Sequence, residues 1–422
     1  MLLHLRSIAI TAGLIVAFLA PSHPAMGQAG SLDPTFGTGG IVTSSIGPPP
    51  GTAALDASGN ILIAGTTAAF QPGQIVRFLA NGQFDTSFGT AGVATTPGPM
   101  QISTVVVQAD GKILVGGFTN AMNADEDFAL ARYNTDGTPD TTFGSGGLVV
   151  TLFPPPVVGG GVQVILEQPD GKIVAAGANI NSVAVRYHSD GSIDESFGNG
   201  GVVQGVPGSE IITAMAVQSN GTILLSWAAS AGLRELSPTG EHVRVKIGTI
   251  IGVAGFMQNN GEVLELDDIA QNAQAESKPA HERSRPLSRA PTRQAVELKR
   301  FRTNGQADPT FNSPEFYWQS QPAADLDLSY MSSAAFPSNG QIVAAGWSTT
   351  APAGVFALGR FGSTGAFDPT FGAGGVVTTK ILDNCSIQHV LIQSSGKIVA
   401  IGLASNTGAT SSDLALARYL SE

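Results

Sequence analysis

The sequence predicts an all-β protein, a seven-bladed β-propeller of four-stranded antiparallel blades, closed by pairing of its N- and C-terminal segments. Three observations lead to this prediction. An apolar pair of segments around a tight turn recurs seven times, a strand that carries one Arg recurs seven times, and relatives of DPTFGTGG follow most of these strands. Repeats of this length, with several short strands and many turns, are typical of propellers.

The first recurring unit is the apolar pair around a glycine turn, as in VQADGKILVGG and FPSNGQIVAAG. Gly follows Asn, Asp or Ser in each turn, and Gly accepts the positive φ that a tight hairpin requires. Each copy therefore predicts two antiparallel strands. The turn glycines are Gly59, Gly111, Gly171, Gly221, Gly261, Gly340 and Gly396.

The second and third units place an Arg and an Asp eight residues apart, around a loop such as ANG or TDG. A three-residue loop that ends in a left-handed Gly folds the chain back, so residues four positions either side of its centre face each other. Opposite charges pair there, which predicts structural ion pairs rather than a ring of arginines that binds anions. The pairs are Arg77/Asp85, Arg132/Asp140, Arg186/Asp194, Arg300/Asp308 and Arg360/Asp368.

Three further residues fall outside this list. Arg234 departs from the pattern because His242 stands at its partner position. Arg418 near the C-terminus and Asp33 near the N-terminus each lack the partner that the spacing predicts. We expect Asp33 beside Arg418, which would close a ring and remove exposed sheet edges.

Each unit then offers four strands: one after the FGxGG motif, such as residues 376–379, two around the glycine turn, and the Arg strand. Six or eight blades, through one degenerate repeat, and an open β-solenoid are the alternatives.

The string FALARYNTDGTPDTTFGSGG, with QADGKILVGG upstream of it, resembles the bacterial delta-60 repeat, a propeller-forming family. The resemblance extends over nearly all of residues 31–420. It implies a propeller and export, and it transfers no catalytic residues to this chain. The unit LRELSPTGEHVRVKIG departs from it, because it lacks both the Asp and the FG pair.

Residues 1–27 are expected to be a secretory signal peptide. Arg6 provides a positive start, residues 8–20 form an apolar run, and Ala25-Met26-Gly27 is a small-x-small cleavage pattern. The run is too short to span a bilayer comfortably, so an uncleaved anchor is the second interpretation. The mature chain, a single propeller over residues 31–420, would be exported to the periplasm or the extracellular space. It has one cysteine, Cys385, and therefore no internal disulfide.

Residues 267–295 are predicted to be a disordered insertion loop within the fifth blade. The segment is polar, contains three prolines and has no apolar period, so it cannot bury enough surface to offset the entropy of ordering. Four arginines make it locally basic. An arm that contacts an acidic partner is the alternative to a solvated insertion.

The net charge of −11 argues against nucleic acid and anionic membrane surfaces as partners. The glycine turns and the Arg–Asp links vary little among the copies, whereas the other connections vary. Because successive connections of an antiparallel blade emerge on alternate faces, the uniform connections fall on one face and the variable connections on the other. The sequence therefore predicts a monomeric, non-catalytic scaffold without a membrane span after signal cleavage. It would bind an unknown protein or glycan through variable loops on one face.

Candidate binding residues on that face are Phe70, Phe153, Tyr317, Trp318, Trp347, Asp125 and Glu126. Trp318 with Tyr317 suits stacking on a sugar or anchoring of a protein. Local packing under a loop is the simpler interpretation of these aromatic residues.

Catalytic signatures are weak in this sequence. It has no GxSxG elbow, no glycine-rich phosphate loop and no cluster of His and Cys with metal-ligand spacing. Loops such as NTDGTPD place oxygens close together, but Asn or Thr replaces Asp136 in other copies, so Asx turns account for them. We expect no catalytic residue, metal or cofactor. The alternative is a divalent-cation-dependent hydrolase or lyase with its site at the central channel.

Overall fold

The computed structural model describes residues 28–68, 71–119, 127–153, 160–178, 181–207, 212–227, 232–247, 252–257, 262–268, 295–302, 306–311, 316–317, 332–348 and 354–422. Every regular element in these ranges is a β-strand, so the prediction of an all-β protein is confirmed. Within the same ranges, no helix has the length and apolar character needed to cross a membrane.

The strands pair into four-stranded antiparallel sheets, numbered here along the chain. Sheet 1 contains β2 (Thr52–Leu55), β3 (Ile61–Gly65), β4 (Pro72–Phe78) and β5 (Val93–Pro99). Sheet 2 contains β6 (Gln101–Val107), β7 (Ile113–Thr119), β8 (Asp127–Tyr133) and β9 (Leu148–Thr151). Sheet 3 contains β10 (Val162–Glu167), β11 (Ile173–Ala178), β12 (Asn181–Tyr187) and β13 (Val202–Pro207).

The second half of the chain repeats this arrangement. Sheet 4 contains β14 (Ile212–Val217), β15 (Ile223–Trp227), β16 (Gly232–Leu236) and β17 (His242–Ile247). Sheet 5 contains β18 (Gly252–Met257), β19 (Val263–Asp268), β20 (Ala295–Phe301) and β21 (Phe316–Tyr317). Sheet 6 contains β22 (Ser333–Ala335), β23 (Ile342–Ser348), β24 (Val355–Phe361) and β25 (Val376–Thr379).

Sheet 7 combines the two ends of the chain. It contains β26 (Asn384–Ile392), β27 (Ile398–Ser405) and β28 (Asp413–Tyr419), and β1 (Ile41–Ser44) is its outermost strand. The pairing is antiparallel, with Val42 opposite Leu416 and Thr43 opposite Ala415. The N-terminal segment is therefore held by the last strand of the chain.

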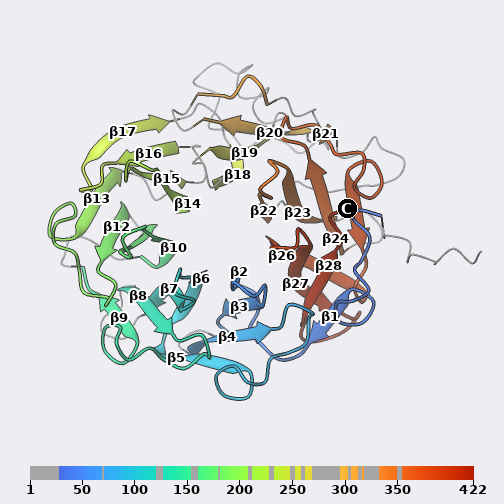
Figure 1. Cartoon of the computed structure of the whole chain (residues 1–422), viewed down its shortest axis with the longest axis horizontal. Coiled ribbons are helices and arrows are strands. Elements are labelled where there is room, and N and C mark those ends of the chain that lie inside the picture. The colour runs from blue at the N-terminus through green and yellow to red at the C-terminus, as the bar shows by residue number, and fades with distance from the viewer. Residues whose placement is uncertain are drawn as a thin grey trace, which may run out of the picture.

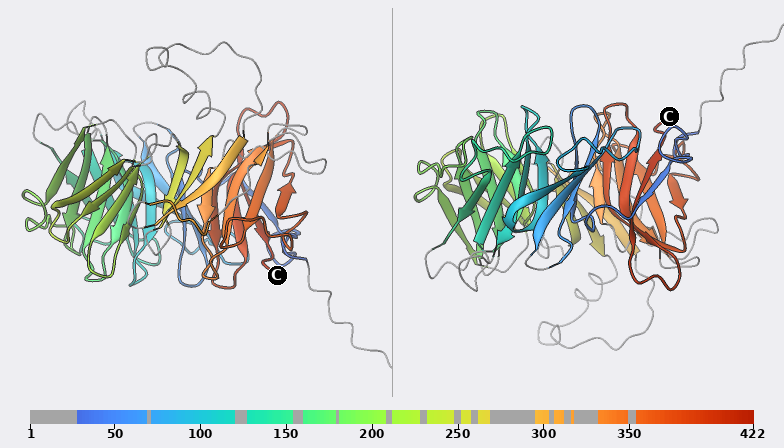
Figure 2. Two further views of the ribbon diagram at one scale, coloured as in Figure 1. Left: turned by 90° about the horizontal axis from the view of Figure 1, so that it is seen from above. Right: turned by 90° about the horizontal axis from the view of Figure 1, so that it is seen from below.

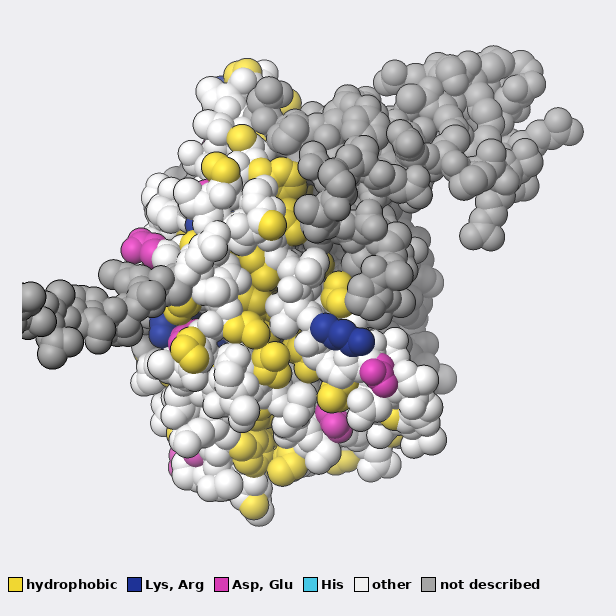
Figure 3. All heavy atoms as spheres, turned by 90° about the vertical axis from the view of Figure 1, so that its right-hand side faces the viewer, with side chains coloured by type: hydrophobic (Ala, Val, Ile, Leu, Met, Phe, Trp, Pro, Cys, Tyr) yellow, Lys and Arg dark blue, Asp and Glu magenta, His cyan; other side chains and the backbone are white. Residues whose placement is uncertain are grey.

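The sheets stand around a common centre (Figure 1). The strands nearest to it are β2, β6, β10, β14, β18, β22 and β26. The hydrophobic core lies between neighbouring sheets. For example, Leu62 and Ile75 of sheet 1 pack in one buried cluster with Val105 and Val115 of sheet 2. The side of the ring near β24 and β28 shows mostly uncharged side chains (Figure 3), which agrees with the 13% of charged residues in the sequence.

The assignment of the strand after FGxGG to the start of its unit is wrong. In sheet 6 this strand, β25, pairs with the preceding Arg strand, so that Leu358 lies opposite Val377. The Arg–Asp loop reverses the chain and returns it along the Arg strand, which makes the FGxGG strand the outermost one of the same sheet. The four-stranded count is unaffected, but the unit begins at the strand before the glycine turn.

Sheets 1 to 6 follow chain order, and so do β26, β27 and β28 of sheet 7, so the connections alternate between the two ends of the ring. The glycine turns and the Arg–Asp loops fall at one end, called the hairpin end. The connections from second to third strand, and from each outermost strand to the next sheet, fall at the other, called the variable end. The strands run between these ends, and the C-terminus, which follows the Arg418 strand, marks the hairpin end (Figure 2).

The predicted insertion connects β19 to β20 at the variable end. Asp267 and Asp268 belong to β19, and Ala295 begins β20, so the connection itself is residues 269–294. That segment, like residues 1–27, lies outside the described residues.

Candidate functional site

The Arg–Asp loops fold as the eight-residue spacing requires. In sheet 2, the Asp140 N–H donates to the carbonyl of Arg132, and Tyr133 faces Pro139 across the hairpin. Gly137 takes a φ of 84°, the left-handed conformation that lets the three-residue loop close. The two charged side chains are thereby placed opposite each other and are buried, with Arg132 5% exposed.

Each Arg donates through Nε to Oδ2 of its Asp, at distances of 2.7–2.9 Å. The structure brings together Arg77 with Asp85, Arg132 with Asp140, Arg186 with Asp194, Arg300 with Asp308, Arg360 with Asp368, and Arg418 with Asp33. The last pair joins residues from opposite ends of the chain. These charged side chains hold the backbone in place.

The other carboxylate oxygen of each Asp accepts hydrogen bonds from the turn that follows it. Asp140 Oδ1 accepts from the N–H of Thr142 at 3.0 Å and from its hydroxyl at 2.6 Å. The same bonds to a Ser or Thr two positions on are made by Asp33, Asp85, Asp194, Asp308 and Asp368. One carboxylate thus fixes a turn with one oxygen and an Arg with the other.

The Arg also contacts the ring of the Phe three positions after its Asp, and these three residues are called the Arg–Asp–Phe cluster. In sheet 2 the guanidinium carbon of Arg132 lies 4.4 Å from the centroid of Phe143, which is fully buried. Corresponding contacts of 4.4–4.9 Å occur at Phe36, Phe88, Phe143, Phe197, Phe311 and Phe371. Cation–π attraction adds to the ion pair at such distances.

Each Arg–Asp–Phe cluster reaches the next sheet in the ring. Arg132 Nη1 donates to the carbonyl of Ser189, in the loop of sheet 3, and the Gly144 N–H donates to the carbonyl of Asp190 at 2.8 Å. The acceptor carbonyls of the six Arg residues belong to Ala80, Thr135, Ser189, Pro238, Ser363 and Ser421. The cluster therefore joins neighbouring sheets as well as closing its own hairpin.

A lysine adds a second cation to three of these carboxylates. Lys112, Lys172 and Lys397 lie 2.7–3.1 Å from Asp140, Asp194 and Asp33. Burial raises the pKa of the Asp33 carboxyl, but hydrogen bonds from Lys397 and Thr35 and the charge of Arg418 outweigh it, so this pKa lies well below its usual value. The pKa of Asp140 is lowered in the same way, against burial, by Thr142, Lys112 and Arg132.

Sheet 4 lacks the Asp and Phe of the cluster in its sequence. Arg234 is buried there, and burial lowers the pKa of its guanidinium. His242, at the Asp position, has its Nε2 3.2 Å from the carbonyl oxygen of Gln204 in sheet 3.

The predicted binding residues of the variable end are described only in part. Phe153 packs edge-on against Phe128, with ring centroids 5.1 Å apart, and belongs to the border of a buried cluster. Tyr317 ends strand β21 and Trp347 lies within β23. Phe70, Asp125, Glu126 and Trp318 lie outside the described residues.

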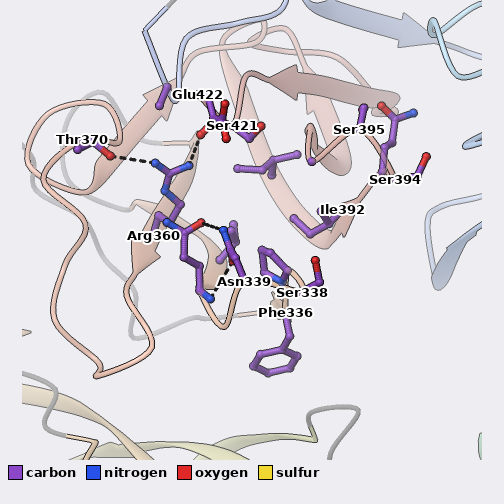
Figure 4. Close-up of a pocket in the computed structure, with 17 residues that line it drawn as sticks. Phe336, Ser338, Asn339, Arg360, Thr370, Ile392, Ser394, Ser395, Ser421 and Glu422 are labelled. Carbon is purple, nitrogen blue, oxygen red and sulfur yellow. Dashed lines mark hydrogen bonds between the residues drawn. The ribbon is translucent and has the colours of Figure 1, made fainter.

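A pocket of about 850 Å³ opens at the hairpin end, between the glycine turns of sheets 6 and 7. Phe336, Ser338 and Asn339 line it from the turn of sheet 6, and Ile392, Ser394 and Ser395 line it from the turn of sheet 7 (Figure 4). Arg360 lies in its wall, where it donates to the Thr370 hydroxyl and to the Ser421 carbonyl. The size lies within the range of small-molecule sites. The sequence reasoning did not anticipate this pocket.

Strand β26, next to the centre of the ring, carries the thiol of Cys385 and the imidazole of His389. The Cys385 thiol donates to the Gly354 carbonyl, and burial raises its pKa, which keeps it protonated and unreactive. His389 Nε2 lies 3.1 Å from the Pro50 carbonyl oxygen, and burial lowers the pKa of its ring. Within the part of the chain that the structure describes, no three His, Cys, Asp or Glu side chains are grouped as metal ligands.

The sequence reasoning identified the Arg and Asp of each cluster but missed the Ser or Thr, the Phe and the Lys. The signal was present, because Asp-x-Ser/Thr-Phe recurs in six copies, from Asp33–Phe36 to Asp368–Phe371. A hydroxyl two residues after an Asp is the pattern of a side chain that bonds its own turn.

Five segments of the chain match a protein-family model described as a domain of unknown function (DUF5122) beta-propeller. They are residues 57–88, 108–143, 168–197, 338–371 and 393–422, which lie in sheets 1, 2, 3, 6 and 7. The model supports a propeller repeat and does not carry the delta-60 name. A search of the curated proteins finds no match.

Solved structures share the fold at low sequence identity. A streptogramin B lyase structure is 11% identical, over 90% of this chain and 97% of that chain, with a TM-score of 0.51. A catalytically inactive virginiamycin B lyase from Staphylococcus aureus with quinupristin is also 11% identical, over 90% and 99%, with a TM-score of 0.51. Polysaccharide lyase Uly1 is 9% identical, over 90% and 91%, with a TM-score of 0.45. The likeness to the two structures with a TM-score of 0.51 is one of fold alone.

Proposed function

Because the chain is a β-propeller repeat protein, we propose that it is an exported, non-catalytic scaffold that binds a protein or glycan through the connections of its variable end. A fold that hosts lyases and other proteins does not decide between binding and catalysis, so the proposal depends on where this chain varies.

The observation that carries the proposal is the separation of uniform and irregular connections. At the hairpin end, the Arg–Asp–Phe cluster repeats in six sheets with nearly the same bonds. At the variable end, the connections differ in length, from one residue between β5 and β6 to 26 residues between β19 and β20. Binding loops on a fixed frame have this distribution.

The longest connection provides the test. Asp268 lies opposite Val296 in the β19–β20 ladder, so a two-residue Asn-Gly turn between this pair can replace residues 269–295 without a change of register. Envelope extract is passed over the full-length protein and over this variant. We expect a partner that the full-length protein retains and the variant loses.

The matched control changes the opposite end. Glu195→Gln alters an exposed charge in the Arg–Asp loop of sheet 3 and leaves the variable end intact, so it should retain the partner. Retention should also survive EDTA. Equal retention by the deletion variant would overturn the role of this connection, and loss on EDTA would favour the cation-dependent alternative.

We also propose that the seven sheets are the blades of one closed ring. Support comes from the β1–β28 pairing and from Arg418 Nη1, which donates to the Ala80 carbonyl and so links sheet 7 to sheet 1. Export rests on the pattern of residues 1–27, and mass spectrometry of the protein from the envelope should find an N-terminus at Gln28.

A further inference from the structure

The pocket between the glycine turns of sheets 6 and 7 arises where the repeat changes one residue. The residue three positions before the turn glycine is Gln in most repeats, as at Gln108, Gln168, Gln218 and Gln393. It is Asp56 in sheet 1 and Pro337 in sheet 6. Gln393 Nε2 donates to the carbonyl of Gly59, in the glycine turn of the next sheet, at 2.8 Å. Gln108 Nε2 likewise crosses to Glu167 of the next sheet at 3.0 Å. Pro337 has no donor that could cross to sheet 7.

The partner side of the same junction has no polar side chain at the position of Glu167, which is apolar in sheets 1, 2, 4 and 7 alike. Between sheets 2 and 3, Glu167 accepts from Gln108 and from the N–H of Ala109, which holds the two turns together. In sheet 7, Ile392 stands at the position of Glu167. Both halves of that polar link are therefore absent from the sequence of this junction, and the pocket lies between the turns.

The lining is neutral, polar at the rim and apolar beneath. Ser338, Asn339, Ser394 and Ser395 are exposed at the two turns, where sheets 2 and 3 have the charged Asp110 and Asp170. Ile392 is half-buried below them, and the buried Val343 and Ile398 lie in the same cluster and also line the pocket. The Phe336 side chain packs on the other side of sheet 6, against Leu264 and Phe311 of sheet 5. Hydroxyl and amide groups that surround an apolar floor suit a ligand with many hydroxyls and an apolar ring face.

The charged and polar groups beside the pocket already have partners within the protein. Arg360 donates to Asp368 and to the Ser421 carbonyl, Gln341 donates to Asp368 at 2.8 Å, and Lys397 pairs with Asp33. Glu422 lies at the edge with an exposed carboxylate, which disfavours an anion.

We propose that this pocket binds a neutral oligosaccharide, at the end of the ring opposite to the variable connections. The apolar face of a pyranose would pack on Ile392, and the hydroxyls would bond Ser338, Asn339 and Ser395.

The test uses three neutral trisaccharides, maltotriose, cellotriose and triacetylchitotriose, with trigalacturonate as the anionic counterpart. Each is titrated into the full-length protein and followed by saturation-transfer NMR and calorimetry. We expect at least one neutral probe to bind with a Kd on the order of 1 mM or tighter, and trigalacturonate to bind at least about tenfold more weakly.

Pro337→Gln restores the residue of most other repeats and should close the pocket. Its new N–H can donate to the Gln341 carbonyl, as the Gln108 N–H does to Lys112, so the fold should be retained. Binding should fall at least about tenfold with an unchanged thermal midpoint. Ser338→Ala with Ser395→Ala should give a similar loss, whereas Ser58→Ala, at the position of Ser395 in sheet 1, should give none.

Three results would overturn the proposal: no saturable binding of any neutral probe up to about 10 mM, equal binding of trigalacturonate, or full binding by Pro337→Gln. The serine pair decides the matter if Pro337→Gln proves unstable.

Discussion

The buried carboxylates differ in how many cations neutralise them. Asp140 contacts both Arg132 and Lys112, whereas Asp368 contacts Arg360 and the uncharged amide of Gln341. Removal of the Arg should therefore have unequal effects, because a buried charge left without a cation costs far more than the loss of one contact.

Arg360→Ala should lower the free energy of unfolding by about 3–5 kcal/mol, since it leaves Asp368 without a cation. Arg132→Ala should cost less, about 1–3 kcal/mol, because Lys112 remains beside Asp140. Urea denaturation measures both. The control is Asp110→Asn, which removes the loose pairing of an exposed charge with Lys112 but keeps an oxygen for the Lys112 N–H, and it should change stability by at most about 0.5 kcal/mol. Equal costs for the two arginines would contradict the role of the lysine.

The lowered pKa values of Asp33, Asp140 and Asp194 set the response to acid. An Asp of the unfolded chain titrates near pH 3.9, and these groups titrate below that in the folded protein. As the pH falls below about 4, the unfolded state takes up more protons, so stability is lost. We expect a flat free energy of unfolding from about pH 7 to pH 5 and a decline below pH 4. A decline that begins above pH 6 would point to histidine instead.

At the scale of the hairpin, the sequence predicted the pairings that depend on local geometry. Gly after Asn, Asp or Ser gave the turns, and the eight-residue spacing gave the Arg–Asp pairs. It did not predict which neighbour the FGxGG strand joins, because an apolar strand such as 376–379 fits the strand before it or after it equally well. Only the reversal at the Arg–Asp loop selects the preceding strand.

The pocket was beyond sequence reasoning for a similar reason. Pro337 is visible in the repeat alignment as a departure from Gln, as is Asp56 in sheet 1, but its effect depends on where the Gln side chain reaches. That reach is across a junction between sheets, as Gln393 shows by its bond to Gly59. Sequence copies reveal a changed position without revealing its contact.

Substitutions at two turn glycines can distinguish the cost of backbone strain from the cost of a clash between neighbouring sheets. Gly137 and Gly171 have nearly equal φ, 84° and 80°, but a Cβ on Gly137 would meet the Gly89 nitrogen and the Phe88 ring at 2.8 Å, whereas one on Gly171 would meet nothing within 4 Å. Ala at either site bears the left-handed strain, about 1 kcal/mol.

Gly137→Ala should therefore be the more destabilising change, by a further ~1–3 kcal/mol, because it pushes sheet 2 away from sheet 1. Chemical denaturation of the two variants side by side gives the difference. If both lose the same amount, the contact between the loop and Phe88 does not contribute to stability.

At the scale of the whole molecule, the Asp33–Arg418 pair is the ordinary repeat contact made between distant parts of the chain. The Asp33 N–H donates to the Arg418 carbonyl and the Leu420 N–H donates to the Ser31 carbonyl, so the first and last segments form one hairpin-like unit. Loss of this pair should make local opening of the structure easier at both ends of the sequence and in sheet 1.

Asp33→Ala should raise amide hydrogen exchange in β1, in β28 and in the sheet 1 loop at residues 79–83, which accepts from Arg418. Asp140→Ala, the matched change inside the chain, should raise exchange only in sheets 2 and 3. Mass spectrometry of peptic peptides resolves these regions. Faster exchange confined to residues 28–44 in Asp33→Ala would count against a closed ring.

The Arg of each cluster is received by a peptide oxygen, and the residues that supply that oxygen are Ala, Thr, Ser and Pro. A main-chain acceptor is present whatever amino acid is encoded there. The receiving loops are thus free to accumulate mutations while the donor must stay Arg, so neighbouring copies can diverge one at a time without coordinated change in the gene.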